Sequence, residues 1–297
     1  MSNSDEEMDV NFKTDVVDYD LPHIVDGVET VCYNGMPKIE LRFWKSFQKA
    51  ASLMSFITKL KKHPINILDA RYRNLDYEKS GITKCNLESE VTDWEKVEID
   101  NSPEQNTYKA ELREIIKKLH PQAKKIEFYS FIRRGGGGQH SNPPAKDEPH
   151  LDYYQDSKAC HDYTGTGPEY RCEEGFESRI ILGIWKPIDM KNEVYDYPLV
   201  FLDASTFDSD RMVRFEQDFT HFVNGKEISV KNLAANLKYD KKQKWYYYSK
   251  QNVNEVAIFR HYTKGQFKAN VHCSIQQDLP LGCDTRCSIE TRAVLFW

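Results

Sequence analysis

The sequence predicts a mainly β protein with helical support, folded as a double-stranded β-helix, the jelly-roll arrangement of cupin-like proteins. Three observations support this fold class. The chain has 297 residues, enough for one sizeable core. Two helical patterns lie before residue 125, and short apolar runs between turn signals fill the rest. Helices followed by many short strands indicate packed sheets with helices to one side.

The composition excludes several classes of protein. Hydrophobic residues make up 39% and charged residues 29%, as in ordinary globular proteins. The net charge of -5 gives no overall basic surface for nucleic acid. No apolar run approaches the roughly 20 residues of a membrane span, and the acidic start lacks the features of a secretory signal. The seven scattered cysteines form no C-x-x-C pair, so we expect free thiols. Together these features predict a cytoplasmic protein without membrane or nucleic-acid partners.

Two helices are expected in the first part of the chain. From Glu40 to Lys62, apolar residues recur every three or four positions, and His63-Pro64 should end this helix. The second helix should run from Pro103 to Leu119 and end at His120-Pro121.

The segments around these helices are expected to be irregular. Residues 1–20 are acidic and polar and should form a disordered tail, followed by a short β-like piece at 27–33. Residues 70–105 are charged and irregular, which favours a surface loop that could serve as a substrate lid.

The second part of the chain has the pattern of short strands. We expect a hairpin formed by 244–249 and 255–262. Without an internal repeat or an inter-domain linker, residues 21–297 should form a single jelly-roll domain. The expected strands are 126–132, 179–188, 198–203, 244–249, 255–262, 267–274 and 286–297.

A metal site is the first chemistry that the sequence suggests. His150 and Asp152 lie two residues apart, so on a strand they point to the same side and can converge on one ion. A third ligand must come from elsewhere, and His272 is the histidine that sits in a late strand. Two histidines and one carboxylate leave adjacent coordination positions open. The other histidines lie beside prolines, in loops or in polar surroundings: His23, His63, His120, His140, His161, His221 and His261.

A polar strand face follows fourteen residues after His272. Arg286, Ser288, Glu290 and Arg292 alternate with Cys287, Ile289, Thr291 and Ala293. Such a face either points to water or lines a polar cavity, and the upstream metal motif favours the cavity. An arginine with a nearby hydroxyl can bind the far carboxylate of a metal-bound 2-oxo acid, because its guanidinium is a planar double donor. Arg286 could instead be a surface arginine.

These motifs together resemble the clavaminate-synthase-like superfamily of iron(II)/2-oxoglutarate oxygenases. More narrowly, residues 105–297 resemble a fungal and bacterial hydroxylase/desaturase group related to gibberellin desaturase-like enzymes of secondary metabolism. The matching stretches are Phe128–Arg133, His150–Asp152, Ile181–Ile188, Pro198–Asp203, Trp245–Tyr248, Glu255–Tyr262, Val271–His272 and, most characteristically, Arg286–Arg292.

The resemblance implies a ligand set and a cosubstrate site. His150, Asp152 and His272 would hold Fe(2+), and Arg286 with Ser288 would bind 2-oxoglutarate, with Arg292 as helper or alternative. One departure matters: the family usually has an asparagine two residues before the strand tryptophan, and here that position is Gly183. Either a backbone group takes over that role or the wall has opened for another substrate.

Weaker candidates surround this site. The glycine run at 135–138 lacks the lysine end of a phosphate loop and suggests a flexible gate. Arg133 could reach inward and bind a substrate carboxylate. Tyr153 or Tyr154 could line the pocket or pack in the core, and Trp185 is most simply a core aromatic that could also contact substrate.

The expected function is oxidation of an unactivated C–H bond of a small-molecule substrate, using Fe(2+), 2-oxoglutarate and O2. Hydroxylation, desaturation and oxidative ring closure, as in kainoid synthases, all remain open. Two alternatives stay: a jelly-roll metalloenzyme that does not use 2-oxoglutarate, which would be indifferent to Arg286, and a non-catalytic partner protein that has lost the chemistry.

Overall fold

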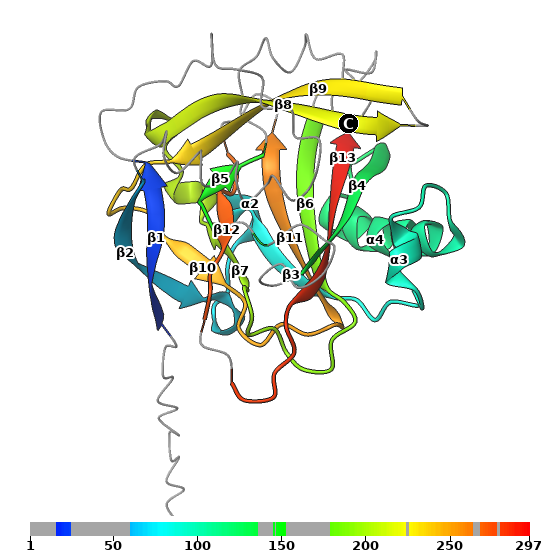
Figure 1. Cartoon of the computed structure of the whole chain (residues 1–297), viewed down its shortest axis with the longest axis horizontal. Helices are drawn as coiled ribbons and strands as arrows, with labels where there is room; N and C mark the ends of the chain where they lie inside the picture. Colours follow the sequence, from blue (N-terminus) through cyan, green and yellow to red (C-terminus); the bar gives the residue numbers. More distant parts are fainter. Residues whose placement is uncertain are drawn as a thin grey trace, which may run out of the picture.

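The structure is a computed structural model, and it describes residues 16–24, 60–135, 145, 147–152, 179–223, 226–263, 268–277 and 280–297. Among these residues, mostly antiparallel strands form two sheets, and a few helices lie between the strands along the chain (Figure 1). The helices are α2 (Tyr77–Ser80), α3 (Trp94–Val97) and α4 (Pro103–Leu119), with 3-10 turns η2 (Ala70–Tyr72), η4 (Ala204–Thr206) and η5 (Ser209–Arg211).

The first sheet has eight strands in the order β1-β2-β10-β7-β12-β5-β9-β8. Its strands are β1 (Val16–Ile24), β2 (Leu60–Asp69), β5 (His150–Leu151), β7 (Leu199–Leu202), β8 (Met212–Val223), β9 (Lys226–Leu237), β10 (Trp245–Tyr247) and β12 (His272–Ser274). The second sheet has five strands in the order β3-β11-β6-β13-β4, namely β3 (Ile82–Asn86), β4 (Lys125–Gly135), β6 (Arg179–Pro187), β11 (Glu255–Thr263) and β13 (Cys287–Phe296).

The two sheets face each other across an aromatic core. Phe201 from β7 and Phe259 from β11 meet with ring centroids 5.0 Å apart, and Trp185 from β6 is buried in the same cluster. Alternate residues of β7 point the other way: Val200 and Leu202 belong to a separate apolar cluster. The inner face of each sheet therefore carries both the core and, as shown below, the candidate site.

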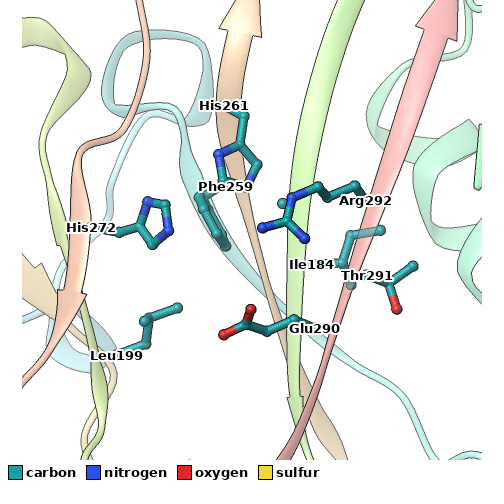
Figure 2. Close-up of a pocket in the computed structure, with 9 residues that line it drawn as sticks. Ile184, Leu199, Phe259, His261, His272, Glu290, Thr291 and Arg292 are labelled. Carbon is teal, nitrogen blue, oxygen red and sulfur yellow. The ribbon is translucent and has the colours of Figure 1, made fainter. Parts of the chain in front are cut away.

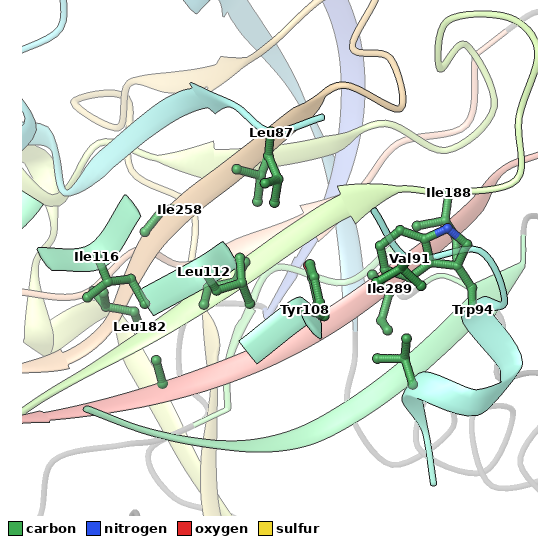
Figure 3. Packing of buried hydrophobic residues seen from close by; sticks show 14 of the residues in the cluster. Leu87, Val91, Trp94, Tyr108, Leu112, Ile116, Leu182, Ile188, Ile258 and Ile289 are labelled. Atoms are coloured by element: carbon green, nitrogen blue, oxygen red, sulfur yellow. The ribbon is translucent and has the colours of Figure 1, made fainter. Parts of the chain in front are cut away.

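Helix α4 covers the outer face of the five-stranded sheet, beside β4 and β13 (Figure 1). Ser102 caps it by accepting a hydrogen bond from the Gln105 backbone, and Pro103 occupies the first turn, where its missing N–H costs nothing. Figure 3 shows its apolar stripe of Tyr108, Leu112 and Ile116 packed in one cluster with Leu182, Ile258 and Ile289 of the sheet. The predicted helix 103–119 is thus confirmed, including its end before His120.

The predicted helix 40–62 is wrong at its end, because Leu60–Asp69 forms β2; its earlier part lies outside the described residues. Burial in β2 alternates, with Ile65 and Ile67 buried and Pro64 and Asn66 exposed, which is the period of a strand. Pro64 fits because β10 pairs with β2 only from Ile67 onward, so the ladder on that side needs no N–H from the proline.

Two further expectations near the N-terminal side change. Residues 16–20 belong to β1 rather than to a disordered tail, and they pair with β2. The charged segment 70–105 is not an irregular loop, because it contains α2, β3 and α3. Trp94 and Val97 of α3 are buried against α4, so this segment is part of the packed structure rather than a loose lid. The β-like piece at 27–33 lies outside the described residues.

The predicted hairpin of 244–249 and 255–262 is also wrong. Both segments are strands, but β10 pairs with β7 and β2, whereas β11 pairs with β6 and β3. The chain therefore crosses from one sheet to the other between them, as jelly-roll strands do.

Within the described residues, four cysteines are free thiols, and no helix is long and apolar enough to cross a membrane.

Candidate metal centre and its pocket

The inner face of the eight-stranded sheet brings His150, Asp152 and His272 together. His150 in β5 stands directly opposite His272 in β12, and their ring centroids are 4.5 Å apart. Asp152 follows β5, and its Oδ1 lies 3.5 Å from His150 Nε2. One ligand atom from each residue lies within 4.8 Å of the others, and this is the one such group among the described residues.

Backbone carbonyls set the orientation of both imidazoles. Nδ1 of His150 donates to the Glu148 carbonyl at 2.7 Å, and Nδ1 of His272 donates to the Asn270 carbonyl at 3.2 Å. Because a carbonyl can only accept, each Nδ1 carries the proton and each Nε2 offers a lone pair. This is how metal-binding histidines are usually held.

The charge states of the three groups suit a divalent cation. Burial lowers the pKa of His272, which favours the neutral imidazole that a metal requires. Burial alone would raise the pKa of Asp152, but the nearby charge of Arg292 and the surrounding histidines hold that pKa well below its usual range. Two neutral imidazoles and one carboxylate oxygen are a donor set that fits iron(II).

Arg286 lies in a buried polar cradle. Its Nε donates to Ser288 Oγ at 2.9 Å, and its Nη1 donates to Ser274 Oγ at 2.7 Å and to the Tyr197 carbonyl at 2.8 Å. The guanidinium carbon lies 5.1 Å from the ring centroid of Trp185. Burial lowers the pKa of Arg286 to about 10, so the guanidinium remains protonated at neutral pH.

This cradle fits an anionic ligand. Nη2 of Arg286 is buried and has no hydrogen-bond partner among the described residues, and the nearest carboxylate oxygen, on Glu290, is 3.7 Å away. Ser274, which holds Arg286, lies two residues after His272 on the same face of β12. At a rise of about 3.3 Å per residue, Ser274 is displaced about 6.6 Å along β12 from His272, so the Arg286 guanidinium that contacts Ser274 lies farther along the strand than the candidate metal position.

Arg292 is placed differently from Arg286. Its Nη2 donates to Oδ2 of Asp152, and its Nη1 donates to Ser130 Oγ at 3.0 Å. Figure 2 shows Arg292 from β13 and His272 from β12 on opposite sides of one pocket, with Phe259 between them and Glu290 below. Because it contacts Asp152, Arg292 lies close to the candidate metal ligands.

Residues 40–296 match the model of a family described as an oxidoreductase/YMDC permease-like domain. The chain belongs to this family. The matched range includes every candidate site residue named above and all the strands except β1, which ends at Ile24.

Relatives within the curated proteins and solved structures extend this finding. The chain is 27% identical over 118 residues to the Fe(II)/2-oxoglutarate-dependent dioxygenase nvfI of Aspergillus novofumigatus. The aligned stretch covers 38% of this chain and 39% of that protein. The matched stretch thus spans about two fifths of the relative's length. This similarity confirms the resemblance to the iron(II)/2-oxoglutarate oxygenase superfamily. The narrower gibberellin desaturase-like grouping stays a prediction.

Solved structures of the iron and alpha-ketoglutarate-dependent endoperoxidase NvfI share the fold. One aligns with a TM-score of 0.64 at 17% identity, covering 95% of this chain and 98% of its own. Another, in a different conformation, aligns with a TM-score of 0.63 at 19% identity, covering 80% and 85%. This likeness confirms the expected jelly roll.

Arg133 does not reach inward, contrary to expectation. It stands opposite Ile289, whose side chain packs under the helices on the outer face, and its Nε is 2.9 Å from Oε2 of Glu98. The neighbouring Arg134 is opposite Ser288 on the inner face, and its Nε lies 2.8 Å from Oε2 of Glu290. The strand parity therefore makes Arg134, which the sequence reasoning passed over, the arginine that faces the pocket.

The remaining candidates have mixed outcomes. Trp185 is buried in the core beneath Arg286, so it supports the guanidinium rather than lining the pocket. Tyr153, Tyr154 and residues 136–138 of the glycine run lie outside the described residues.

His261 is a pocket residue that the sequence reasoning set aside. Its Nε2 is 3.8 Å from Asp152 Oδ2, and its ring centroid is 5.0 Å from that of His272. Burial lowers the pKa of His261 well below its usual range, so the ring is neutral. The flanking Arg260 and Tyr262 concealed it, although its place in an apolar strand was a signal.

Gly183 is explained by the same neighbours. A Cβ at this position would lie 2.5 Å from His261 Nε2 and closer still to the ring of Phe259. The wall has therefore not opened for a substrate: the space beside Gly183 is filled by two side chains from β11.

Proposed function

We propose that the protein is an iron(II)- and 2-oxoglutarate-dependent oxygenase that oxidises an unactivated C–H bond of a small, secondary-metabolite-like molecule. The observation that carries this proposal is the pairing of His150, Asp152 and His272 with Arg286, whose buried Nη2 has no hydrogen-bond partner among the described residues. A metal site alone would not require a buried arginine at this spacing. The names of the relatives agree with this chemistry.

The chain's residues have distinct parts in the proposed reaction. His150, Asp152 and His272 would hold the metal, and Arg286 with Ser288 would bind the far carboxylate of 2-oxoglutarate. Iron(II), 2-oxoglutarate and oxygen together supply the oxidising power needed to remove hydrogen from carbon. The protein fixes the cosubstrate's direction, and the apolar wall around Phe259 and Leu199 keeps water from the pocket.

We further propose that residues 21–297, joined by residues 16–20 of β1, act as one domain in the cytoplasm and that the substrate is a small molecule rather than nucleic acid or membrane lipid. Hydroxylation, desaturation and ring closure all begin by removing hydrogen from carbon. The mass of the product distinguishes hydroxylation, which adds one oxygen, from desaturation and ring closure, which both remove two hydrogens.

The experiment is oxygen-dependent turnover of 2-oxoglutarate by the iron(II)-loaded protein, measured as succinate. The parent is compared with Arg286→Gln and with Arg133→Gln, a matched arginine change on the outer face. Succinate formed by the parent and Arg133→Gln, but lost in Arg286→Gln, is the expected result.

Two other results would point to the alternatives. Iron bound by the parent without any binding of 2-oxoglutarate would indicate a jelly-roll metalloenzyme of another kind. A protein that binds neither iron nor 2-oxoglutarate would be a non-catalytic binding partner, and the proposal would be wrong.

A further inference from the structure

Arg286, directly before β13, and Arg292, within β13, contact different residues around the pocket. Arg286 meets Ser274 and Ser288, whereas Arg292 meets Asp152 and Ser130. The sequence resemblance groups them as a single cosubstrate site, and the contacts separate them.

The two carboxylate oxygens of Asp152 have different surroundings. Oδ1 lies 3.5 Å from His150 Nε2, the nitrogen that faces the candidate metal position. Oδ2 accepts a hydrogen bond from Arg292 Nη2 and lies 3.8 Å from His261 Nε2. One oxygen therefore faces the ligand set, and the other is held by the second sheet.

The support behind Arg292 is built into β4. The pairing of β4 with β13 shifts register between Glu290 and Arg292, and Ser130 at this irregularity has a φ of 59°, in the left-handed region. A β-bulge redirects a side chain, and here the Ser130 hydroxyl accepts from Arg292 Nη1 at 3.0 Å. The planar fork of arginine can donate to Ser130 and Asp152 at once, which a lysine cannot do in the same geometry.

We propose that Arg292 is a positioning residue, fixed by Ser130, that holds Oδ2 of Asp152 so that only Oδ1 is offered to the metal. This inference rests on the proposed function for the identity of the site, and it removes Arg292 from the cosubstrate-binding set. A carboxylate that gives one oxygen leaves more coordination positions for cosubstrate and oxygen than one that gives two.

The test measures metal binding and cosubstrate binding separately. Cobalt(II) is the metal probe, because its visible absorption reports coordination, and iron(II) is titrated without oxygen. Arg292→Gln, Arg292→Lys and Ser130→Ala are compared with Arg286→Gln and with Arg133→Gln. 2-Oxoglutarate is then titrated into each protein at saturating cobalt(II).

We expect Arg292→Gln to weaken metal affinity about 10- to 100-fold and to change the cobalt(II) spectrum. Arg292→Lys should behave similarly, and Ser130→Ala should show a smaller loss of metal affinity in a protein that keeps Arg292. Arg286→Gln should instead keep the parent's metal affinity and spectrum and lose affinity for 2-oxoglutarate. Arg133→Gln should match the parent in both measurements.

A parent-like metal affinity and spectrum in folded Arg292→Gln would overturn the inference. So would a loss of 2-oxoglutarate affinity equal to that of Arg286→Gln with metal binding intact, because Arg292 would then belong to the cosubstrate site. If Arg292→Gln does not fold, Ser130→Ala decides, and unchanged metal binding in that variant overturns the inference. If no protein binds 2-oxoglutarate but the Arg292 effect on metal persists, the inference stands and the proposed function fails.

Discussion

At the scale of single residues, Arg286 is the group that distinguishes this pocket from a simple metal site. Its guanidinium donates to three acceptors, and the remaining nitrogen is buried without a hydrogen-bond partner among the described residues, with the nearest Glu290 oxygen 3.7 Å away. A buried donor left unsatisfied costs free energy, so a carboxylate that pairs with it should bind strongly.

Arg286→Gln should therefore abolish the preference of the protein for 2-oxo acids that carry a second carboxylate. The parent should bind 2-oxoglutarate about 10- to 150-fold more tightly than 2-oxopentanoate, which lacks the far carboxylate, since a hydrogen bond to a charged group contributes about 1.5–3 kcal/mol. The variant should bind both acids with similar, weak affinity. Calorimetry on the metal-loaded protein without oxygen measures this ratio, and a ratio that survives in the variant would refute the assignment.

The sequence predicted the residues of the site better than their directions. The spacing of His150 and Asp152 allowed the two side chains to converge, and the structure brings them together with His272. Arg133 was misplaced and Arg134 missed because the parity of β4 is set by its register with β13, which is a long-range property. His261 was missed for a local reason, because the polar residues Arg260 and Tyr262 flank it in the sequence.

At the scale of elements, β6 and β11 fit together only because Gly183 has no side chain. Gly183→Ala should destabilise the protein by about 1–3 kcal/mol, since the new methyl group would collide with Phe259 and His261. Urea unfolding measures the loss. Phe259→Leu combined with Gly183→Ala should recover part of it relative to the sum of the single changes, and strict additivity would contradict the proposed collision.

An ion-pair cluster attaches the 70–86 segment to β11. Glu255 accepts from Arg71 Nη2 at 2.7 Å and from Lys84 Nζ at 2.5 Å. Burial alone would raise the pKa of Glu255, but these hydrogen bonds outweigh it and lower the pKa from 4.5 to about 2. The cluster therefore stabilises the folded state above pH 4.5 and loses this effect as the pH falls toward 2.

Glu255→Gln should accordingly lower the free energy of unfolding by about 2 kcal/mol at pH 7, since charged hydrogen bonds are lost. The difference from the parent should shrink as the pH falls from 4.5 toward 2, because the parent's carboxylate becomes protonated there. Urea titrations across this range measure it. Glu95→Gln, at an exposed pair with Arg133, is the control and should change stability by less than about 0.5 kcal/mol. If the loss of stability in Glu255→Gln does not depend on pH, the ion pairs are not its cause.

The sequence predicted elements well where one pattern decided them. Helix 103–119 has its cap, its stripe and its stop within its own residues. The start of β2 was assigned to a helix because apolar spacing continued to Leu60, and the hairpin 244–262 was assigned because adjacency favours it. Sheet membership and strand pairing depend on partners far along the chain, which single-segment patterns do not contain.

At the scale of the whole molecule, the site joins two sheets. The candidate metal ligands come from or adjoin the eight-stranded sheet, whereas Arg286, Arg292 and His261 come from or adjoin the five-stranded sheet. The fold class was predictable because strand density and turn signals are summed over many residues. The strand order was not predictable, since it depends on how the two layers meet.

Metal binding should stabilise the folded protein, since the unfolded chain has no assembled site. At a metal concentration about 100 times the dissociation constant, the gain is about 2.7 kcal/mol, which should raise the Tm by a few degrees. Thermal unfolding with cobalt(II), and then with excess EDTA, measures the rise and its reversal. Asp152→Asn should show little rise, and an equal rise in that variant would place the binding elsewhere.

Asn270 makes the metal site sensitive to the distance between the layers. Its Nδ2 donates to the Leu202 carbonyl in β7, its Oδ1 accepts from the Arg260 backbone in β11, and its own carbonyl fixes His272. Any loosening between the two sheets is therefore transmitted directly to the imidazole. On warming, metal affinity and the contact between the two sheets should therefore weaken together, so excess metal should delay inactivation by heat.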